Sequence, residues 1–147
     1  MEGARVRKAA LSDAAAVASL IAEFAGELGR SVDPDHANRL LAAGWGEFPP
    51  SLHAWVAWRG ETPVGVAVCV ESFSTFSARP SLMLEDLYIT KTDRGAGVSR
   101  CLLDAVMEFG SANGYPRLDL TCSEELVKFY VRLGAGATPR TCVRFTL

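Results

Sequence analysis

A glycine-rich turn between a strand-like and a helix-like segment is the feature that most constrains how this chain can fold. The turn reads Arg94-Gly95-Ala96-Gly97-Val98-Ser99 and joins the apolar segment Leu82–Ile89 to the helically patterned segment Val98–Asn113. Glycine lets the backbone turn tightly, and the first N–H groups of a helix point outward at the positive end of its dipole. The pattern predicts a phosphate or pyrophosphate site, with a ligand-free connection as the alternative.

The residues around the turn disfavour two common phosphate ligands. In a dinucleotide-binding G-x-G-x-x-G fingerprint the third glycine would fall on Arg100, whose large side chain hinders close packing of helix on strand. Asp119 lies at about the distance expected of a ribose-binding acid, but this agreement stands alone. A nucleoside triphosphate is disfavoured because no Lys-Ser or Lys-Thr pair follows the last glycine.

Length and charge restrict the class of protein further. A chain of 147 residues is predicted to form a single domain, residues 1–147. Its net charge of −2 does not favour a nucleic-acid-binding surface. The longest apolar runs, such as Val64–Val70, are too short to cross a bilayer, and Met1–Arg5 does not lead into a signal-peptide hydrophobic region. We therefore expect a cytoplasmic protein that binds neither nucleic acid nor membranes.

Alternating strand and helix periods predict a three-layer α/β domain. Ser12 is placed to cap a first helix that runs to about Leu28 and ends at Gly29. Asp33-Pro34 is placed to start a second helix, which Ala43-Gly44 closes. The other expected helices are Val98–Asn113 and Glu124–Leu133, and the expected strands are Arg5–Ala9, Trp55–Trp58, Pro63–Phe73, Leu82–Ile89, Arg117–Leu120 and Cys142–Leu147.

The cysteines show no metal-binding pattern. They are widely separated, without a C-x-x-C pair or a histidine at zinc-ligand spacing, and we expect them to be reduced and mostly buried: Cys69, Cys101, Cys122 and Cys142. A nucleophilic cysteine would need an activating base, and the only histidines, His36 and His53, lie far away in the sequence. No metal site is predicted.

The turn resembles motif A of the GNAT acetyltransferases, in which R/Q-x-x-G-x-G/A follows a strand, opens a helix and holds the pyrophosphate of acetyl-CoA. Arg94 and Gly97 fill the first two fixed places, and Ser99 stands where the family has Gly or Ala. Downstream, Val127–Ala135 resembles the family segment F/L-Y-x-x-x-G-A/F. Upstream, Leu84–Ile89 and the preceding Phe73-Ser74-Thr75-Phe76 look like the strand pair of the diamine acetyltransferases.

This resemblance implies a GNAT fold, with a mixed, splayed central sheet flanked by helices, and acetyl-CoA as the cosubstrate. It also implies which residues bind that cosubstrate, through the strand before the turn and through the turn itself. These are Leu87, Tyr88, Ile89, Arg94, Gly95, Ala96, Gly97, Val98, Ser99 and Arg100.

The implied reaction is attack of an amine on a thioester, for which a group must accept the proton of the amine. Glu85 resembles the family glutamate that does this through a water, and Asp86 is its rival. Adjacent strand residues point to opposite faces unless a bulge intervenes, so one of the two faces the acceptor. The alternatives are that Glu85 is only a carboxylate on a solvated sheet edge, or that the enzyme uses no dedicated base.

Tyr130 is the second candidate catalytic residue. The resemblance places its hydroxyl near the sulfur of CoA, where it would protonate the leaving thiolate. The alternative is a half-buried aromatic on the helix Glu124–Leu133. Leu126 occupies a place where many relatives carry an asparagine that contacts CoA.

The acceptor site is the site that the sequence defines least. In the family it is roofed by the connection between the first two helices and by the loop before the central strand. These segments and that strand offer charged and aromatic candidates for binding an amine: Asp33, Phe73, Phe76 and Asp86. Glu23 and Glu27 lie one helical turn apart, and a solvated helix face accounts for them.

These observations predict an acetyl-CoA-dependent N-acetyltransferase that acts on a primary amine of a small molecule by direct attack in a ternary complex. A polyamine, an amino acid and an amino sugar are the acceptors considered, and the expected partners are this small molecule and, in a homodimer, a second copy. The alternatives are an enzyme that acetylates proteins or peptides and a non-catalytic acyl-CoA-binding domain, which Ser99 and Leu126 favour.

Overall fold

A five-stranded mixed sheet forms the centre of the structure, a computed structural model that describes residues 3–42 and 51–147. The strands lie in sequence order across the sheet: β1 (Arg5–Lys8), β2 (Leu52–Arg59), β3 (Thr62–Ser74), β4 (Arg79–Ile89) and β5 (Leu118–Leu120). The first four pair antiparallel, whereas β5 runs parallel to β4. The predicted mixed α/β sheet is confirmed.

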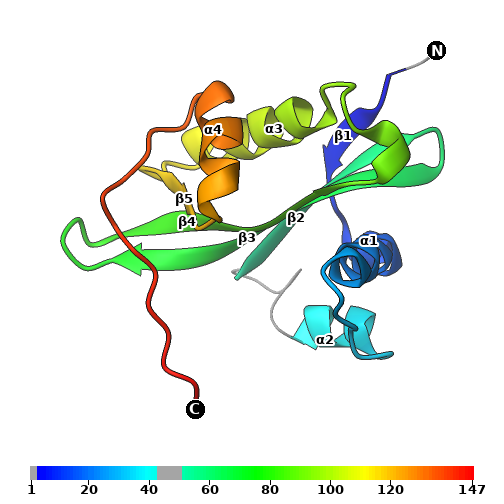
Figure 1. Cartoon of the computed structure of the whole chain (residues 1–147), viewed down its shortest axis with the longest axis horizontal. Helices are drawn as coiled ribbons and strands as arrows, with labels where there is room; N and C mark the ends of the chain where they lie inside the picture. Colours follow the sequence, from blue (N-terminus) through cyan, green and yellow to red (C-terminus); the bar gives the residue numbers. More distant parts are fainter. Residues whose placement is uncertain (1–2, 43–50) are drawn as a thin grey trace.

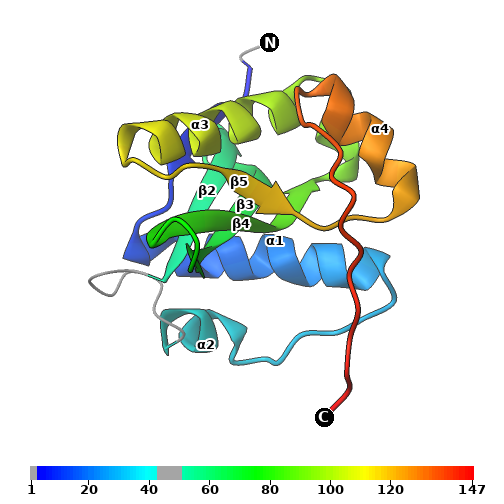
Figure 2. The same cartoon turned by 90° about the vertical axis from the view of Figure 1, so that its left-hand side faces the viewer.

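Helices cover both faces of this sheet (Figures 1 and 2). One face carries α1 (Ala14–Glu27) and α2 (His36–Ala42), and the other carries α3 (Val98–Ala112) and α4 (Glu124–Arg132). Successive residues of a strand point their side chains to opposite faces of the sheet. Val56 and Tyr88 belong to the core beneath α1, while Trp55 and Leu84 belong to the core beneath α3.

A β-bulge interrupts β4 at Glu85. Val68 of β3 lies opposite Asp86 and Cys69 lies opposite Leu84, so Glu85 has no partner in the β3 ladder. The extra residue shifts the alternation of β4 by one position. Leu84 therefore faces the α3 side, and Asp86 shares the α1 side with Tyr88.

The sheet splays between β4 and β5. The two strands pair only where Leu82–Leu84 lies beside Leu118–Leu120. Beyond Leu84, no strand of the described residues pairs with this edge of β4, although β4 continues to Ile89. The predicted splay is confirmed, and it opens just before the glycine-rich turn.

The helix starts differ from the sequence predictions. Ser12 does not cap α1, because a 3₁₀ turn precedes the helix and the Asp13 carboxylate accepts the N–H of Ala10 at 2.8 Å. The second helix begins at His36, since the Asp33 carboxylate accepts the N–H of Asp35 at 2.7 Å in a local turn. Gly29, with φ +70°, follows the end of α1 as predicted, whereas Ala43-Gly44 lies outside the described residues.

Two further expectations are wrong. Residues 142–147 form no strand within the chain and run as an exposed extended segment. Of the four cysteines only Cys69 is buried, so three thiols are exposed. Among the described residues, no helix has the length and apolar character needed to span a membrane.

Candidate active site

The glycine-rich turn has a backbone that suits an anion. Gly95 and Gly97 have φ +82° and +79°, a conformation that strains other residues, and Gly97 directly precedes α3. A Cβ added at either glycine would meet no atom within 4 Å. Glycine is thus required by the backbone, and the space beside the turn is free for a ligand. The unpaired N–H groups at the start of α3 lie at this same place.

A buried aspartate anchors the segment that leads into the turn. Asp93 ends the 3₁₀ turn η2 (Lys91–Asp93) and is 8% exposed. Its carboxylate accepts hydrogen bonds from the hydroxyl of Thr90 at 2.7 Å and from Nε of Arg59 at 2.9 Å. These donors hold the pKa of Asp93 below its usual value. The charged carboxylate therefore joins the start of the turn to the end of β2.

Arg94, the first residue of the motif, has its guanidinium engaged by α1. Its Nη2 donates to both carboxylate oxygens of Glu27, at 3.0 and 2.7 Å, and its Nε donates to the carbonyl of Ile89 at 2.9 Å. Lys91 Nζ lies 3.9 Å from Glu27. The hydrogen bond from Arg94 holds the pKa of Glu27 below its ordinary range. Glu27 is thus part of the site's framework, which its position on a helix face in the sequence did not indicate.

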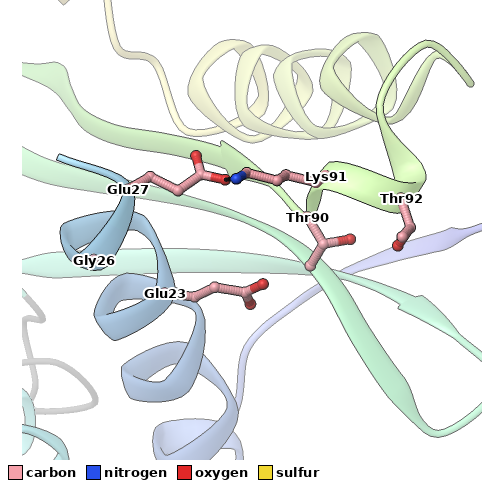
Figure 3. Close-up of a pocket in the computed structure, with 6 residues that line it drawn as sticks. All are labelled: Glu23, Gly26, Glu27, Thr90, Lys91 and Thr92. Carbon is pink, nitrogen blue, oxygen red and sulfur yellow. Dashed lines mark ion pairs between the residues drawn. The ribbon is translucent and has the colours of Figure 1, made fainter. Parts of the chain in front are cut away.

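A polar cavity of about 390 Å³ lies between α1 and η2 (Figure 3). Figure 3 shows the carboxylates of Glu23 and Glu27 reaching from α1 toward Thr90 and Lys91 on the other wall. Its lining carries two carboxylates and one cation, Lys91, and the two threonine hydroxyls add neutral polar groups. The lining residues are Glu23, Gly26, Glu27, Thr90, Lys91 and Thr92.

The strand residues assigned to the cosubstrate divide between the two faces of β4. Leu87 and Ile89 pack toward α3, whereas Tyr88 is buried beneath α1 and stacks on Phe24 with ring centroids 5.3 Å apart. Burial, with the nearby charges of Glu23 and Glu27, raises the pKa of Tyr88 to about 12. What these residues share is the backbone edge that β5 leaves unpaired.

The remaining cosubstrate candidates lie in the glycine-rich turn and the first turn of α3. Val98 is buried in the core, Ser99 is half-buried and Ala96 is exposed. Arg100 Nη2 donates to the carbonyl of Arg132 at 3.3 Å, which ties the start of α3 to the end of α4.

The two candidate bases have different surroundings. Glu85, the bulged residue, is exposed. Asp86 is half-buried, and burial together with the charge of Glu85 raises its pKa, while the charge of His36 at the start of α2 opposes that rise. Asp86 therefore lies on the α1–α2 side. Nothing in the sequence indicated that His36 belongs to the surroundings of this carboxylate.

Tyr130 lies on α4, half-buried against the core beneath α3. It helps to line an apolar cavity of about 420 Å³ between α3, β5 and α4, together with Leu120 and Leu133. Burial raises the pKa of Tyr130 above its ordinary value. Its hydroxyl is therefore protonated at neutral pH and available as a donor.

The acceptor candidates do not form one cluster. Asp33 bonds to Asp35 within the α1–α2 connection and lies 3.3 Å from Nη2 of Arg39. Phe73 and Phe76 are 62% and 102% exposed near the tip of the β3–β4 hairpin, at the other end of β4 from the turn (Figure 1). Within residues 3–42 and 51–147, no group of three or more potential metal ligands occurs.

Comparisons with known proteins agree with this geometry. The model of the acetyltransferase (GNAT) family matches residues 17–135, and the chain belongs to this family. It is an acetyltransferase by that membership, and the family uses acetyl-CoA as its cosubstrate. No functionally curated protein matches the sequence significantly.

Solved structures share the fold. An integron cassette protein from a salt-marsh metagenome is 25% identical, with a TM-score of 0.85 over 97% of this chain and 90% of that chain. An aminoglycoside acetyltransferase from an uncultured soil sample is 16% identical, with a TM-score of 0.81 over 98% and 95%. A ribosomal-protein-alanine N-acetyltransferase from Brucella melitensis biovar Abortus 2308 is 18% identical, with a TM-score of 0.82 over 99% and 100%.

Proposed function

We propose that this protein transfers the acetyl group of acetyl-CoA to a primary amine of a small molecule, by direct attack in a ternary complex. The observation that carries the proposal is the left-handed Gly95/Gly97 turn at the start of α3, beside the edge of β4 that β5 leaves unpaired. An anion-binding turn next to a free strand edge offers a place for the pyrophosphate and a row of backbone groups for the extended arm of CoA.

In this proposal the backbone of Arg94–Ser99 binds the pyrophosphate. The guanidinium of Arg94 serves chiefly to fix the turn against α1. Its Nη2 already donates to Glu27, and its Nε already donates to the carbonyl of Ile89. The edge of Leu87–Ile89 binds the arm of CoA. Val98 and Arg100 support the turn from α3, and Arg100 also bonds to the carbonyl of Arg132 on α4.

Two side chains transfer protons in the proposed reaction. Tyr130 donates its hydroxyl proton to the departing thiolate, a role supported by its protonated state and its place in an apolar cavity. Glu85 accepts the amine proton through water, supported by its exposure at the bulge. Asp86 is the competing base, because its raised pKa lies closer to neutrality than that of an ordinary aspartate.

The acceptor amine approaches from the α1–α2 side. Asp86 and the carboxylate of Glu23 give this side a negative character that suits an ammonium group, whereas the charge of Glu27 is compensated by Arg94 and Lys91. Asp33 belongs to the same region, while Phe73 and Phe76 would contact only an acceptor long enough to reach the hairpin tip. Such a long, cationic acceptor is a polyamine, as the resemblance to the diamine acetyltransferases suggests.

The test measures thiol release from acetyl-CoA with polyamines, amino acids, amino sugars and short peptides as acceptors. We expect turnover with at least one small amine and identify the product by its mass gain of one acetyl group. Peptides as the only acceptors would overturn the small-molecule assignment. Acetyl-CoA binding without any turnover would favour the non-catalytic alternative.

A further inference from the structure

The apolar cavity between α3, β5 and α4 is larger than an acetyl group requires. Its volume is about 420 Å³, and most of its lining residues are apolar, among them Leu82, Leu103, Val106, Leu118 and Leu120. An apolar cavity of about 150 Å³ already holds a benzene molecule. The cavity therefore has room for an unbranched chain of about eight carbons.

Two polar side chains of this lining already have partners within the protein. Tyr115 donates its hydroxyl to Glu71, and Arg117 Nε donates to the carboxylate of Asp119 at 2.8 Å. A ligand at this end of the cavity thus meets chiefly hydrocarbon. The lining suits an aliphatic chain better than a charged or hydrogen-bonding group.

The cavity continues the path proposed for the arm of CoA. That path runs from the glycine-rich turn along the unpaired edge of Leu87–Ile89 toward Leu84, where β5 joins the sheet at Leu120. Leu120 and Tyr130 line the cavity at this junction, and Leu118 lines it farther along β5, beneath α3 (Figure 2). A thioester whose sulfur lies at Tyr130 can therefore extend its acyl chain into the cavity.

We propose that this cavity binds the acyl chain of a medium-chain acyl-CoA, so that the protein transfers acyl groups of about eight carbons in addition to acetyl. The inference rests on the proposed function, because the hydroxyl of Tyr130 must meet the sulfur. The amine nitrogen bonds to the carbonyl carbon of the thioester and its proton passes through water to Glu85. The carbon–sulfur bond breaks, and the thiolate takes the proton of Tyr130. The amine approaches from the α1–α2 side, so the chain on the α3 side leaves its path open.

Calorimetry on the full chain with acetyl-, butanoyl-, hexanoyl- and octanoyl-CoA tests the proposal. Burial of one methylene group raises affinity by up to about fourfold, and we expect octanoyl-CoA to bind at least about 30-fold more tightly than acetyl-CoA. Affinities equal within about threefold across the series would overturn the inference. Turnover with acetyl-CoA would then leave the proposed function intact. If affinity rises with chain length but no thioester is turned over, the proposed function fails and the cavity assignment stands.

Cavity-filling variants separate this cavity from a general attraction of long acyl chains to protein surfaces. Leu118→Phe, at a half-buried position of β5, and Val106→Phe, in the core, each add bulk to the cavity. Each should lower the ratio of octanoyl-CoA to acetyl-CoA affinity at least about tenfold. Ile21→Phe, a matched change at a half-buried position of α1, should keep the ratio. Leu118→Phe decides the test if Val106→Phe does not fold, and an unchanged ratio in that variant would contradict the proposal.

Discussion

Nη2 of Arg94 lies between the two carboxylate oxygens of Glu27, a residue 67 positions earlier in the sequence, at 3.0 and 2.7 Å. This contact joins the last turn of α1 to the first residue of the anion-binding turn. Because α1 borders the proposed acceptor side and the turn is proposed to bind the cosubstrate, the pair would connect the two substrate regions of the proposed enzyme.

Glu27→Gln should make stability less dependent on pH in the acid range. The pKa of Glu27 is lowered by Arg94, so its contribution to stability is present above the ordinary glutamate pKa of about 4.3 and is lost as the pH falls through the lower folded-state value. The Tm of the variant should lie below that of the parent at pH 7 and converge with it on acidification. Glu108→Gln, an exposed change on α3, is the control. A Tm gap of constant size would show that the ion pair is not the cause.

Gly97→Glu should weaken acetyl-CoA binding at least tenfold, equivalent to about 1.4 kcal/mol. The glutamate adds bulk and negative charge where the pyrophosphate is proposed to bind, and it strains a backbone with φ +79°. Gly60→Glu is matched, because Gly60 also has a positive φ and free space but lies in the β2–β3 turn. Calorimetry should show loss of affinity for the first variant alone. Equal losses would indicate that strain, not the site, explains the effect.

Tyr130→Phe should lower turnover roughly 100-fold with little change in acetyl-CoA affinity, as expected when a positioned general acid is removed. Tyr115→Phe removes a hydroxyl that bonds to Glu71 away from the turn and should leave turnover nearly intact. Steady-state rates and binding constants of both variants provide the measurement. Weaker binding with unchanged turnover would assign Tyr130 to packing.

Glu85→Gln should lower turnover at neutral pH, and raising the pH should recover much of it as free amine becomes available. Asp86→Asn should have the smaller effect if Glu85 is the base. Gln and Asn keep the size of the side chains, so rate–pH profiles of the two variants show which carboxylate accepts the proton of the amine. If Glu85→Gln matches the parent at every pH while Asp86→Asn does not, the bulge has turned Asp86 to the reacting amine.

The sequence predicted the parts of the fold that depend on local rules. The strand-turn-helix unit around Gly95 and Gly97 could be recognised because a left-handed turn at a helix start requires glycine at defined places. The splayed sheet followed from the family resemblance. The bulge at Glu85 could not be located, since it depends on how β4 pairs with β3 and leaves no mark in composition.

Long-range contacts account for what was missed. The sequence predicts a solvated helix face for Glu27, because its partner Arg94 is distant in the sequence. The sequence predicts that the second helix begins at Asp33-Pro34, whereas α2 begins at His36, because the carboxylate of Asp33 accepts a hydrogen bond in a turn before the helix. Residues 142–147 have a strand pattern without a strand, because alternation alone does not bring a segment beside a partner strand.

The strand order also determines how the sheet can assemble. β2, β3 and β4 are joined by short hairpins, whereas β1 and β5 reach the sheet only across helical connections. Closing a long connection costs more chain entropy than closing a hairpin, so the three-strand meander is the favoured folding nucleus and β5 docks late. The glycine-rich turn therefore lies at the boundary between the part of the chain that folds first and the part that joins last.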